Sequence, residues 1–288
     1  MTASVSSTLT GLNVYPVKSC RGIAVPQARI GARGLELGAV SSPVGDRTWM
    51  IIDPDGRFIT QRELACLALV ETELASDVLR LSMRGLPAFE VPLARASGAT
   101  REVVVWQSTV PAHDAGDAVA AWLAAALGIA ARLVRYDARH ERRCNPEFAG
   151  DSGAHTAFAD SFPLLIAGEA SLADLNERLA ASACAALPMN RFRPNLVISG
   201  LPAYDEDHLD TIEVDGIVIK LVKPCTRCTT TTTDQATAVR GVEPLSTLAG
   251  YRRNDALGGV TFGMNGIVTA GVGREIAVGS AAHCTYRF

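Results

Sequence analysis

The sequence predicts a mainly β fold with some α-helix, an α+β chain built from two β-rich domains. In the first half, short β-branched or alternating segments follow one another, joined by Gly, Pro and Asp turns. A composition of 48% hydrophobic and 20% charged residues is typical of a folded chain, and 288 residues are enough for two ordinary domains. We expect the domains to cover residues 8–130 and 131–285, because the polar, irregular stretch 135–159 indicates a boundary or a functional loop.

The first half contains four expected strands and one helix near its end. The helix is expected to begin at Asp114 or Asp117 and to run to Leu127, where Gly128 is a suitable C-cap. The expected strands are Leu12–Val17, Arg47–Ile52, Val78–Ser82 and Glu102–Trp106.

The second half also alternates between short strands and few helices. A helix is expected over Glu169–Leu179, because its leucines recur at helical spacing. The expected strands are Pro163–Ala167, Asn195–Ser199, Thr211–Val214, Ile217–Val222 and a closing strand near Gly266–Thr269.

Charge and targeting signals exclude several classes of partner. A formal charge of -3 and a pI near 6.0 give no global attraction to nucleic acid or to anionic membranes. The longest uncharged apolar stretch, Ala118 to Ala131, is too short and too rich in alanine to span a bilayer. Because the N-terminal residues also lack the pattern of a secretory signal, we expect a cytoplasmic protein without a membrane or nucleic-acid partner.

The motif Pro224-Cys225-Thr226-Arg227-Cys228 is the strongest candidate for chemistry. A structural zinc site would need four ligands, and no second CxxC pair exists. A thioredoxin-like pair should open a helix, which the four following threonines disfavour. Two half-buried thiols in a turn without further function remain an open interpretation. Arg227 beside Cys228 would stabilise a thiolate, the form of cysteine that binds a metal.

Basic residues elsewhere supply the parts of an anion site. Lys18 and Ser19 follow a proline-stiffened turn, Arg47 begins a strand, and Arg191 and Arg193 flank Phe192 before a proline. Arginine, lysine and hydroxyl groups together can bind a phosphate. Each residue alone is more simply a solvated surface charge, so the hypothesis requires the fold to bring them together.

Six segments occur in the order found in MOSC-domain proteins that carry a MOSC N-terminal β-barrel. They are YPVKSCRGI, GDRTWMIID, FITQREL, SLADLN, RFRPNLVISG and PCTRC. The chain resembles this family from about Leu9 to about Gly279, and is most similar to the amidoxime-reducing components and the bacterial relatives that detoxify N-hydroxylated bases. The resemblance implies an N-terminal β-barrel-like domain, a MOSC β-barrel domain and a cofactor cleft between them.

The resemblance also implies a molybdenum cofactor of the molybdopterin type and a set of residues that hold it. Cys228 matches the molybdenum ligand and catalytic residue, whereas Cys225 does not bind the metal in the family. The remaining cofactor-binding positions are Lys18, Ser19, Arg47 and Arg193 at the pterin phosphate and ring, Asn195, Thr226 and Arg227 close by, and Asp160 and Ser161 in a further turn.

By the same resemblance, the expected activity is the reduction of N-hydroxylated substrates, such as hydroxylamines, amidoximes and N-hydroxylated bases, to amines or amidines. Electrons would come from a separate ferredoxin- or cytochrome-type donor with its reductase, because the sequence has no dinucleotide-binding fingerprint. The alternative is a non-catalytic protein that carries the molybdenum cofactor or its sulfur.

Overall fold

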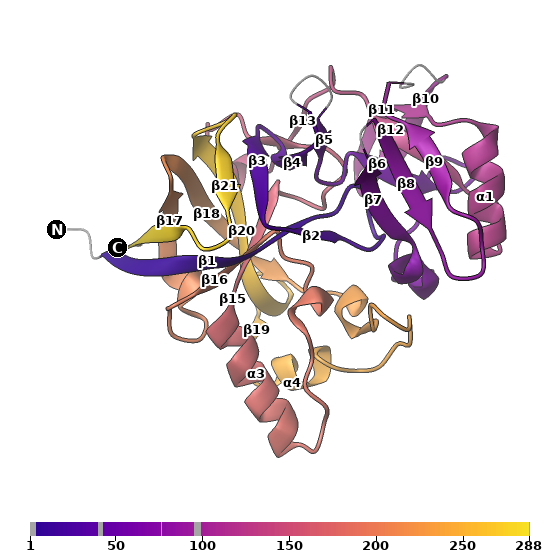
Figure 1. Cartoon of the computed structure of the whole chain (residues 1–288). Helices are drawn as coiled ribbons and strands as arrows, with labels where there is room; N and C mark the ends of the chain where they lie inside the picture. Colours follow the sequence, from indigo (N-terminus) through magenta and orange to yellow (C-terminus); the bar gives the residue numbers. More distant parts are fainter. Residues whose placement is uncertain (1–3, 40–42, 76, 95–98, 288) are drawn as a thin grey trace.

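A closed β-barrel forms one side of the molecule (Figure 1). The computed structural model describes residues 4–39, 43–75, 77–94 and 99–287. Seven of the strands in these ranges follow one another around the barrel, and the last, β20, pairs with the first, β15. In barrel order they are β15 (Leu164–Gly168), β16 (Leu196–Ser199), β1 (Ser4–Val14), β22 (Ala281–Tyr286), β17 (Leu209–Val214), β18 (Ile217–Thr226) and β20 (Gly259–Ala270). The inward-facing aliphatic side chains of these strands form the largest buried apolar cluster.

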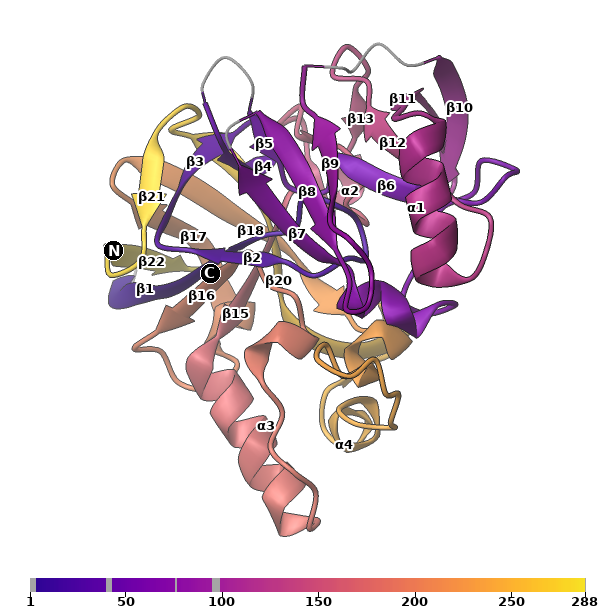
Figure 2. The ribbon, with the colours of Figure 1, turned by 45° about the vertical axis from the view of Figure 1, so that its right-hand side comes forward.

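In the barrel wall, the first strand of the described chain, β1, lies next to the last, β22. β1 lies between β16 and β22 and is antiparallel to both. β15 and β16 are parallel, and α3 (Glu169–Ala181) connects them, as a parallel crossover requires. Figure 2 shows α3 projecting away from the barrel, with α4 (Leu245–Ala249) nearby.

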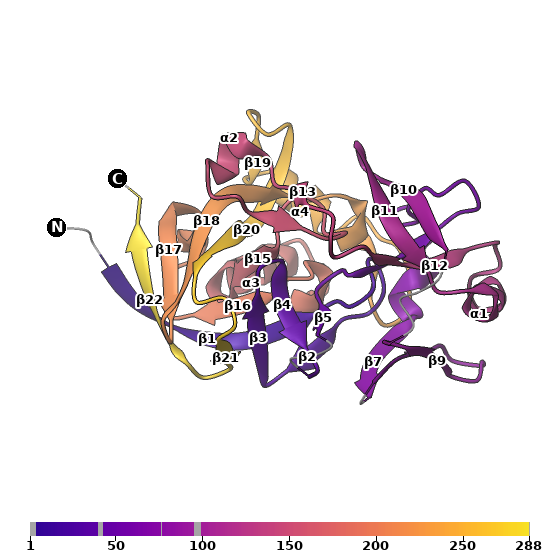
Figure 3. The same ribbon diagram turned by 90° about the horizontal axis from the view of Figure 1, so that it is seen from above.

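The sheets of the first half stand beside the barrel (Figure 3). Trp49 and Leu79 come from two of these sheets and pack with Leu123 of α1 (Asp117–Leu127) in a second apolar cluster. One sheet contains β10 (Thr100–Val105), β11 (Ser108–Asp114), β12 (Arg132–Tyr136) and β6 (Trp49–Ile52), and another contains β7 (Glu71–Ala75), β8 (Val78–Ser82) and β9 (Phe89–Pro92). A further sheet contains β21 (Glu275–Ala277), β3 (Gln27–Gly31), β4 (Gly34–Leu37) and β5 (Val44–Gly45).

Short elements complete the described chain. β2 (Ile23–Val25) pairs with β1, β19 (Arg253–Asn254) with β20, and β13 (Arg142–Arg143) with β14 (His155–Thr156). The helix α2 covers Pro146–Ala149, and 3-10 turns cover Ala65–Leu69, Met189–Arg191, Asp205–His208 and Thr229–Thr232. None of the helices in the described ranges is long and apolar enough to cross a membrane.

The predicted fold class is confirmed, and several element predictions agree with the structure. α1 begins at Asp117 and ends at Leu127, and Gly128 caps it with φ 70° in the left-handed region. The strand predicted near residues 266–269 lies within the longer β20, but the prediction that it closes the chain was wrong, because β21 and β22 follow it. The threonine segment, expected to disfavour helix, forms one short 3-10 turn.

The predicted domain division at residues 130/131 stays a prediction, and strand pairing crosses it in both directions. β1 comes from the first half but lies in the barrel wall. β12 begins just after the division and pairs with β6 and β11. Sequence patterns indicate which segments are strands, but the pairing partners of these strands lie far away along the chain.

Candidate functional site

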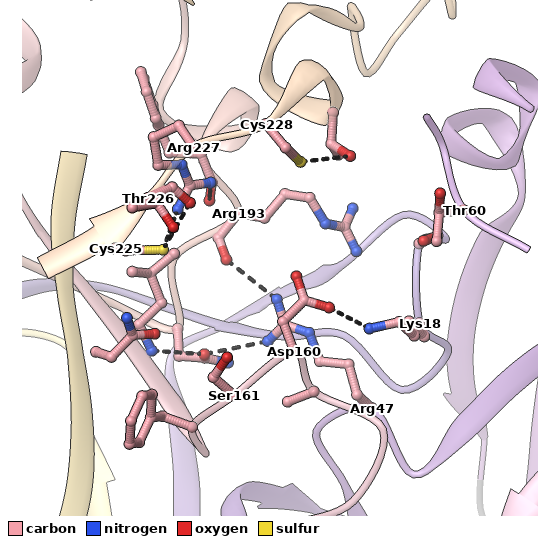
Figure 4. A pocket seen from close by; sticks show the side chains of 18 of the residues that line it. Lys18, Arg47, Thr60, Asp160, Ser161, Arg193, Cys225, Thr226, Arg227 and Cys228 are labelled. Carbon is pink, nitrogen blue, oxygen red and sulfur yellow. Dashed lines mark hydrogen bonds and ion pairs between the residues drawn. The ribbon is translucent and has the colours of Figure 1, made fainter. Parts of the chain in front are cut away.

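A cleft between the barrel and the sheets of the first half contains all ten site residues that the family resemblance predicted. Its volume, with the open space at its mouth, is about 820 Å³. Figure 4 shows Lys18 and Thr60 on one side of it and the Cys225–Cys228 segment on the other. The predicted residues in its lining are Lys18, Ser19, Arg47, Asp160, Ser161, Arg193, Asn195, Thr226, Arg227 and Cys228. The convergence that the anion-site hypothesis requires is therefore present.

Lys18 is held by the chain segment that follows β1. The backbone N–H of Lys18 donates to Trp49 O at 2.8 Å, which ties this turn to β6. The Lys18 ammonium is buried, donates to Phe158 O at 2.8 Å and forms an ion pair with Asp160. Burial lowers the pKa of Lys18, and the Asp160 carboxylate opposes this shift. An ammonium has three N–H donors, so these contacts leave one for a ligand.

Arg47 is fixed by a buried carboxylate and an amide. Its guanidinium forms an ion pair with Asp46, which is 1% exposed, and donates to Asn195 Oδ1 at 3.2 Å. Asp46 also accepts from the backbone N–H of Tyr15 at 2.9 Å and from Asn195 Nδ2 at 2.9 Å. Burial lowers the pKa of Arg47, but Asp46, Tyr15 and Asp160 together outweigh it, so the pKa is raised overall. Asp46 therefore organises this side of the cleft.

Asn195 lines the cleft, but its amide already has protein partners. Oδ1 accepts from Arg47 and from the backbone N–H of Leu165 at 3.1 Å. Nδ2 donates to Asn13 O at 3.1 Å and to Asp46. Both donors and both acceptor sites of the amide are thus satisfied. Asn195 positions Arg47 and is poorly suited to bind a ligand through its own side chain.

In the described part of the chain Arg193 forms no ion pair with a carboxylate, unlike Lys18 and Arg47. It is 7% exposed, its Nη1 donates to Gln235 Oε1 at 3.3 Å, and its Nη2 has no hydrogen-bond partner in the described structure. The guanidinium carbons of Arg193 and Arg47 lie 4.3 and 4.2 Å from the centroid of the Tyr15 ring. Burial lowers the pKa of Arg193 to about 10, and the nearby Arg47 charge adds to the effect.

Three of these site residues have a left-handed backbone. φ is 68° at Ser19, 48° at Arg47 and 56° at Arg193. A non-glycine residue in this region is uncommon and costs conformational energy of about 1 kcal/mol or more. Such strain is enriched at functional sites, where the surrounding structure maintains it. The occurrence of this backbone strain at three converging residues is an independent indication that the cleft is a binding site.

The cysteine motif begins within β18 and ends in the turn after it. Cys228 is exposed at the start of the 3-10 turn, and its Sγ donates to Thr230 Oγ1 at 3.4 Å. The expectation that Arg227 stabilises the Cys228 thiolate was wrong in its geometry. Arg227 Nη1 donates to Cys225 Sγ at 2.9 Å and its Nη2 to Phe192 O at 2.7 Å. β18 extends to Thr226, and alternate residues along extended backbone share a face, so Arg227 is placed beside Cys225.

Arg191 does not belong to the cleft, although the sequence pattern grouped it with Arg193. Its guanidinium is buried and donates to Thr231 O at 2.8 Å, Thr232 O at 2.9 Å and Glu243 O at 3.2 Å. Arg191 therefore stabilises the loop that follows the cysteine motif. The two arginines face different surroundings because Arg191 ends a 3-10 turn and Arg193 has a left-handed backbone, so their side chains do not share one face as they would in a strand.

Asp160 and Ser161 are exposed at the rim of the cleft. Two residues beside them, Trp106 and Arg62, were not predicted from the sequence. Trp106 Nε1 donates to Asp160 Oδ1 at 3.1 Å, and the Arg62 guanidinium lies 4.3 Å from the Trp106 ring centroid. Enclosure by the cleft raises the pKa of Asp160, but the Lys18 charge and hydrogen bonds from Lys18 and Trp106 hold it below its usual range. The other missed lining residues with polar side chains are Thr60, Thr230 and Asn265.

The lining fits a phosphorylated cofactor with a thiolate-bound metal. Buried nitrogens without partners in the described structure, Arg193 Nη2 and Arg227 Nε, match an anionic ligand rich in acceptors. An exposed thiol in the same lining is free to become a metal ligand. Within the described ranges, no group of three or more His, Cys, Asp or Glu side chains is placed to hold a metal ion.

Fold and site together define a β-barrel protein with a cleft that combines cations and one exposed thiol. The chain belongs to the family of MOSC proteins with an N-terminal barrel: residues 6–130 match the MOSC N-terminal beta barrel domain and residues 153–281 match the MOSC domain. It is 35% identical over 254 residues to the human mitochondrial amidoxime-reducing component 1, and 34% over 253 residues to the bovine mitochondrial amidoxime reducing component 2. Each match covers 86% of this chain and 73% of the relative.

A further relative has a different named activity. The bovine molybdenum cofactor sulfurase is 26% identical over 275 residues, which cover 88% of this chain and 30% of the sulfurase.

Proposed function

We propose that this protein is a molybdenum-cofactor-dependent reductase of N-hydroxylated compounds. The observation that carries the proposal is the convergence of three cations, Lys18, Arg47 and Arg193, with the Cys228 thiol in one cleft. These residues lie in segments far apart in the sequence, and a scattered arrangement was the simpler expectation. The names of the amidoxime-reducing relatives support the reaction class.

The cations would hold the anionic end of the cofactor. Arg193 and Lys18 retain unused N–H donors, which suit phosphate oxygens. Arg47 supplies charge, while Asp46 fixes its position. The hydroxyls of Ser19, Ser161 and Thr226 line the same space and can donate further hydrogen bonds. The Cys228 thiolate would bind the molybdenum.

The bound cofactor supplies the two-electron redox chemistry that the side chains of this chain lack. Each N–O bond reduced consumes two electrons and two protons, and yields the N–H compound and one water. Asp160 stays ionised at neutral pH because its pKa is held low, so it acts as an acceptor and not as the proton donor. Its role in this proposal is to hold Lys18 and Trp106 at the rim.

The electrons would come from a separate protein of ferredoxin or cytochrome type with its reductase. The sequence has no dinucleotide-binding G-x-G-x-x-G segment, which supports a separate source.

The direct test compares two cysteine variants after expression in a host that makes the cofactor. We expect purified protein to contain molybdenum and pterin and to reduce benzamidoxime with an artificial low-potential donor. Cys228→Ser should abolish reduction, whereas Cys225→Ser should keep substantial activity, because Cys225 Sγ accepts a hydrogen bond from Arg227 and is not the proposed metal ligand. Equal loss from both variants would indicate a dithiol mechanism and contradict the proposal.

A second candidate is a non-catalytic carrier of the cofactor or its sulfur, which the sulfurase relative favours. A carrier would bind molybdenum cofactor yet show no N-hydroxyl reduction with any donor. The reductase proposal has the wider support, because the chain covers 73% of the amidoxime-reducing relatives and 30% of the sulfurase.

A further inference from the structure

Trp106 occupies an unusual backbone position at the rim of the cleft. β10 and β11 are joined by the two-residue loop Trp106-Gln107, since Val105 pairs with Ser108. φ of Trp106 is 56°, and in the described backbone Gln107 does not share this left-handed conformation. A positive φ at the first loop residue alone is the pattern of a type II′ turn, whose first position favours glycine. A tryptophan here is conformationally unfavourable and therefore calls for an explanation.

Contacts from three neighbours fix the orientation of the indole ring. Its Nε1 donates to Asp160 Oδ1 at 3.1 Å, and Phe58 packs against it with ring centroids 5.1 Å apart. The Arg62 guanidinium carbon lies 4.3 Å from the ring centroid. Asp160 is in turn paired with Lys18 inside the cleft. The ring is thus connected directly to the cationic end of the site.

Trp106 presents an exposed apolar surface at the rim of an otherwise polar cleft. It is 40% exposed, whereas the other aromatic residues of the lining, Phe162 and Phe192, are buried. Among the described residues of the lining, it is the only large hydrophobic side chain with an exposed surface. Its neighbours at the rim are charged or hydroxyl-bearing. An aromatic face in such a place can contribute stacking and apolar contact that none of these neighbours provides.

We propose that Trp106 determines substrate specificity, by stacking its indole ring against the planar, conjugated part of the N-hydroxylated substrate. Asp160 and Arg62 act as positioning residues that fix the orientation of the indole ring for this contact. This inference rests on the proposed reductase function and adds to it a preference for aromatic over small aliphatic substrates. The preference is a property of one side chain, so it can be tested separately from the reaction.

The first test measures binding without turnover. The chain contains three tryptophans, and Trp49 and Trp122 are 1% and 9% exposed, so a ligand in the cleft should quench mainly the fluorescence of Trp106. Cofactor-loaded protein without any electron donor is titrated with benzamidoxime and with acetamidoxime, which carries the same functional group without a ring. We expect stronger quenching and about tenfold tighter binding for benzamidoxime, an effect of the size that aromatic pairs contribute.

Three variants separate the roles of the tryptophans. Trp106→Leu should lose the tenfold preference, and Trp106→Phe should keep part of it. Trp122→Phe, in α1 and outside the cleft lining, should keep the quenching and the preference. Preference for benzamidoxime that persists in Trp106→Leu would overturn the inference, and so would equal quenching by both ligands in the unaltered protein.

The second test measures turnover and cofactor content together. In Trp106→Leu, kcat/KM for benzamidoxime should fall about tenfold, while kcat/KM for acetamidoxime and the molybdenum content stay within about twofold of the unaltered protein. A loss of molybdenum from the variant would show that the indole holds the cofactor, which contradicts a role in substrate selection. Absence of any reduction by the unaltered protein would refute the reductase proposal, whereas the quenching experiment would still decide whether Trp106 selects planar ligands.

Discussion

Replacing Arg193 by methionine removes a buried charge and keeps an unbranched side chain of similar length. The fall in the pKa of Arg193 from 12.5 to about 10 corresponds to about 3 kcal/mol that the guanidinium cation loses in this environment. Arg193 nevertheless stays protonated at neutral pH. The variant removes this penalty, but also the contact with Tyr15 and the hydrogen bond to Gln235, together about 2–3 kcal/mol.

These opposing contributions nearly cancel. We therefore expect the unfolding free energy of cofactor-free Arg193→Met to lie within about 1 kcal/mol of that of the unaltered protein. Cofactor retention should behave differently, because a charge-assisted hydrogen bond to an anion contributes about 1.5–3 kcal/mol. That loss corresponds to roughly ten- to hundredfold weaker binding.

Arg191→Met is the matched control, since the two arginines are two positions apart and equally buried, with exposed fractions of 6% and 7%. Arg191 donates to three backbone carbonyls, so its loss leaves buried acceptors unsatisfied and should lower the unfolding free energy by about 3 kcal/mol. Urea unfolding of the cofactor-free proteins and molybdenum analysis of loaded protein are the two assays. A loss of more than about 3 kcal/mol in cofactor-free Arg193→Met would refute the view that Arg193 is maintained for a ligand.

Three further outcomes are expected. Asp46→Ala should destabilise the protein by about 3–5 kcal/mol in urea unfolding, because Arg47 would remain as a buried charge without its carboxylate; a loss below 1 kcal/mol would contradict this account. The ionised form of Asp160 stabilises the fold above about pH 4, since its pKa is lower in the folded protein than in the unfolded chain, and this contribution is lost as the pH falls through the folded-state pKa. Asp160→Asn should therefore lower Tm at pH 7 and approach the unaltered protein below about pH 4, and a difference in Tm that stayed constant over this range would argue against the Lys18 ion pair. Pure protein should not oxidise NADPH with benzamidoxime as acceptor, and self-sufficient turnover in a spectrophotometric assay would disprove the need for a separate donor.

Local patterns in the sequence predicted the elements that local forces determine. The leucine spacing of α3 and the glycine after α1 are properties of short segments, and both helices are present. The position of β1 in the barrel wall depends on pairing with β22, more than 260 residues away, and no short-range pattern contains that information. The strand order in the wall therefore had to come from the structure.

The same distinction applies to the cleft. Motif positions identified the lining residues, but not which contacts they make there. Arg227 beside Cys228 in sequence is beside Cys225 in space, because extended backbone alternates its side chains. Asn195 matched a ligand position, yet its amide is already satisfied by protein groups. Trp106 was missed because its importance arises from a hairpin tip that reaches the rim from another sheet.

The pairing of β1 with β22 has a consequence for how the molecule is made during translation. β1 is synthesised more than 260 residues before one of its two neighbours in the wall, residues 281–286, leaves the ribosome. Until then β1 and β17 each present an unpaired edge, and the barrel cannot close. Such distant pairing is slow to form and exposes the nascent chain to aggregation. Because the cysteine segment continues from a barrel strand, stable cofactor binding is expected only once β22 has joined the wall, and deletion of β22 should abolish it.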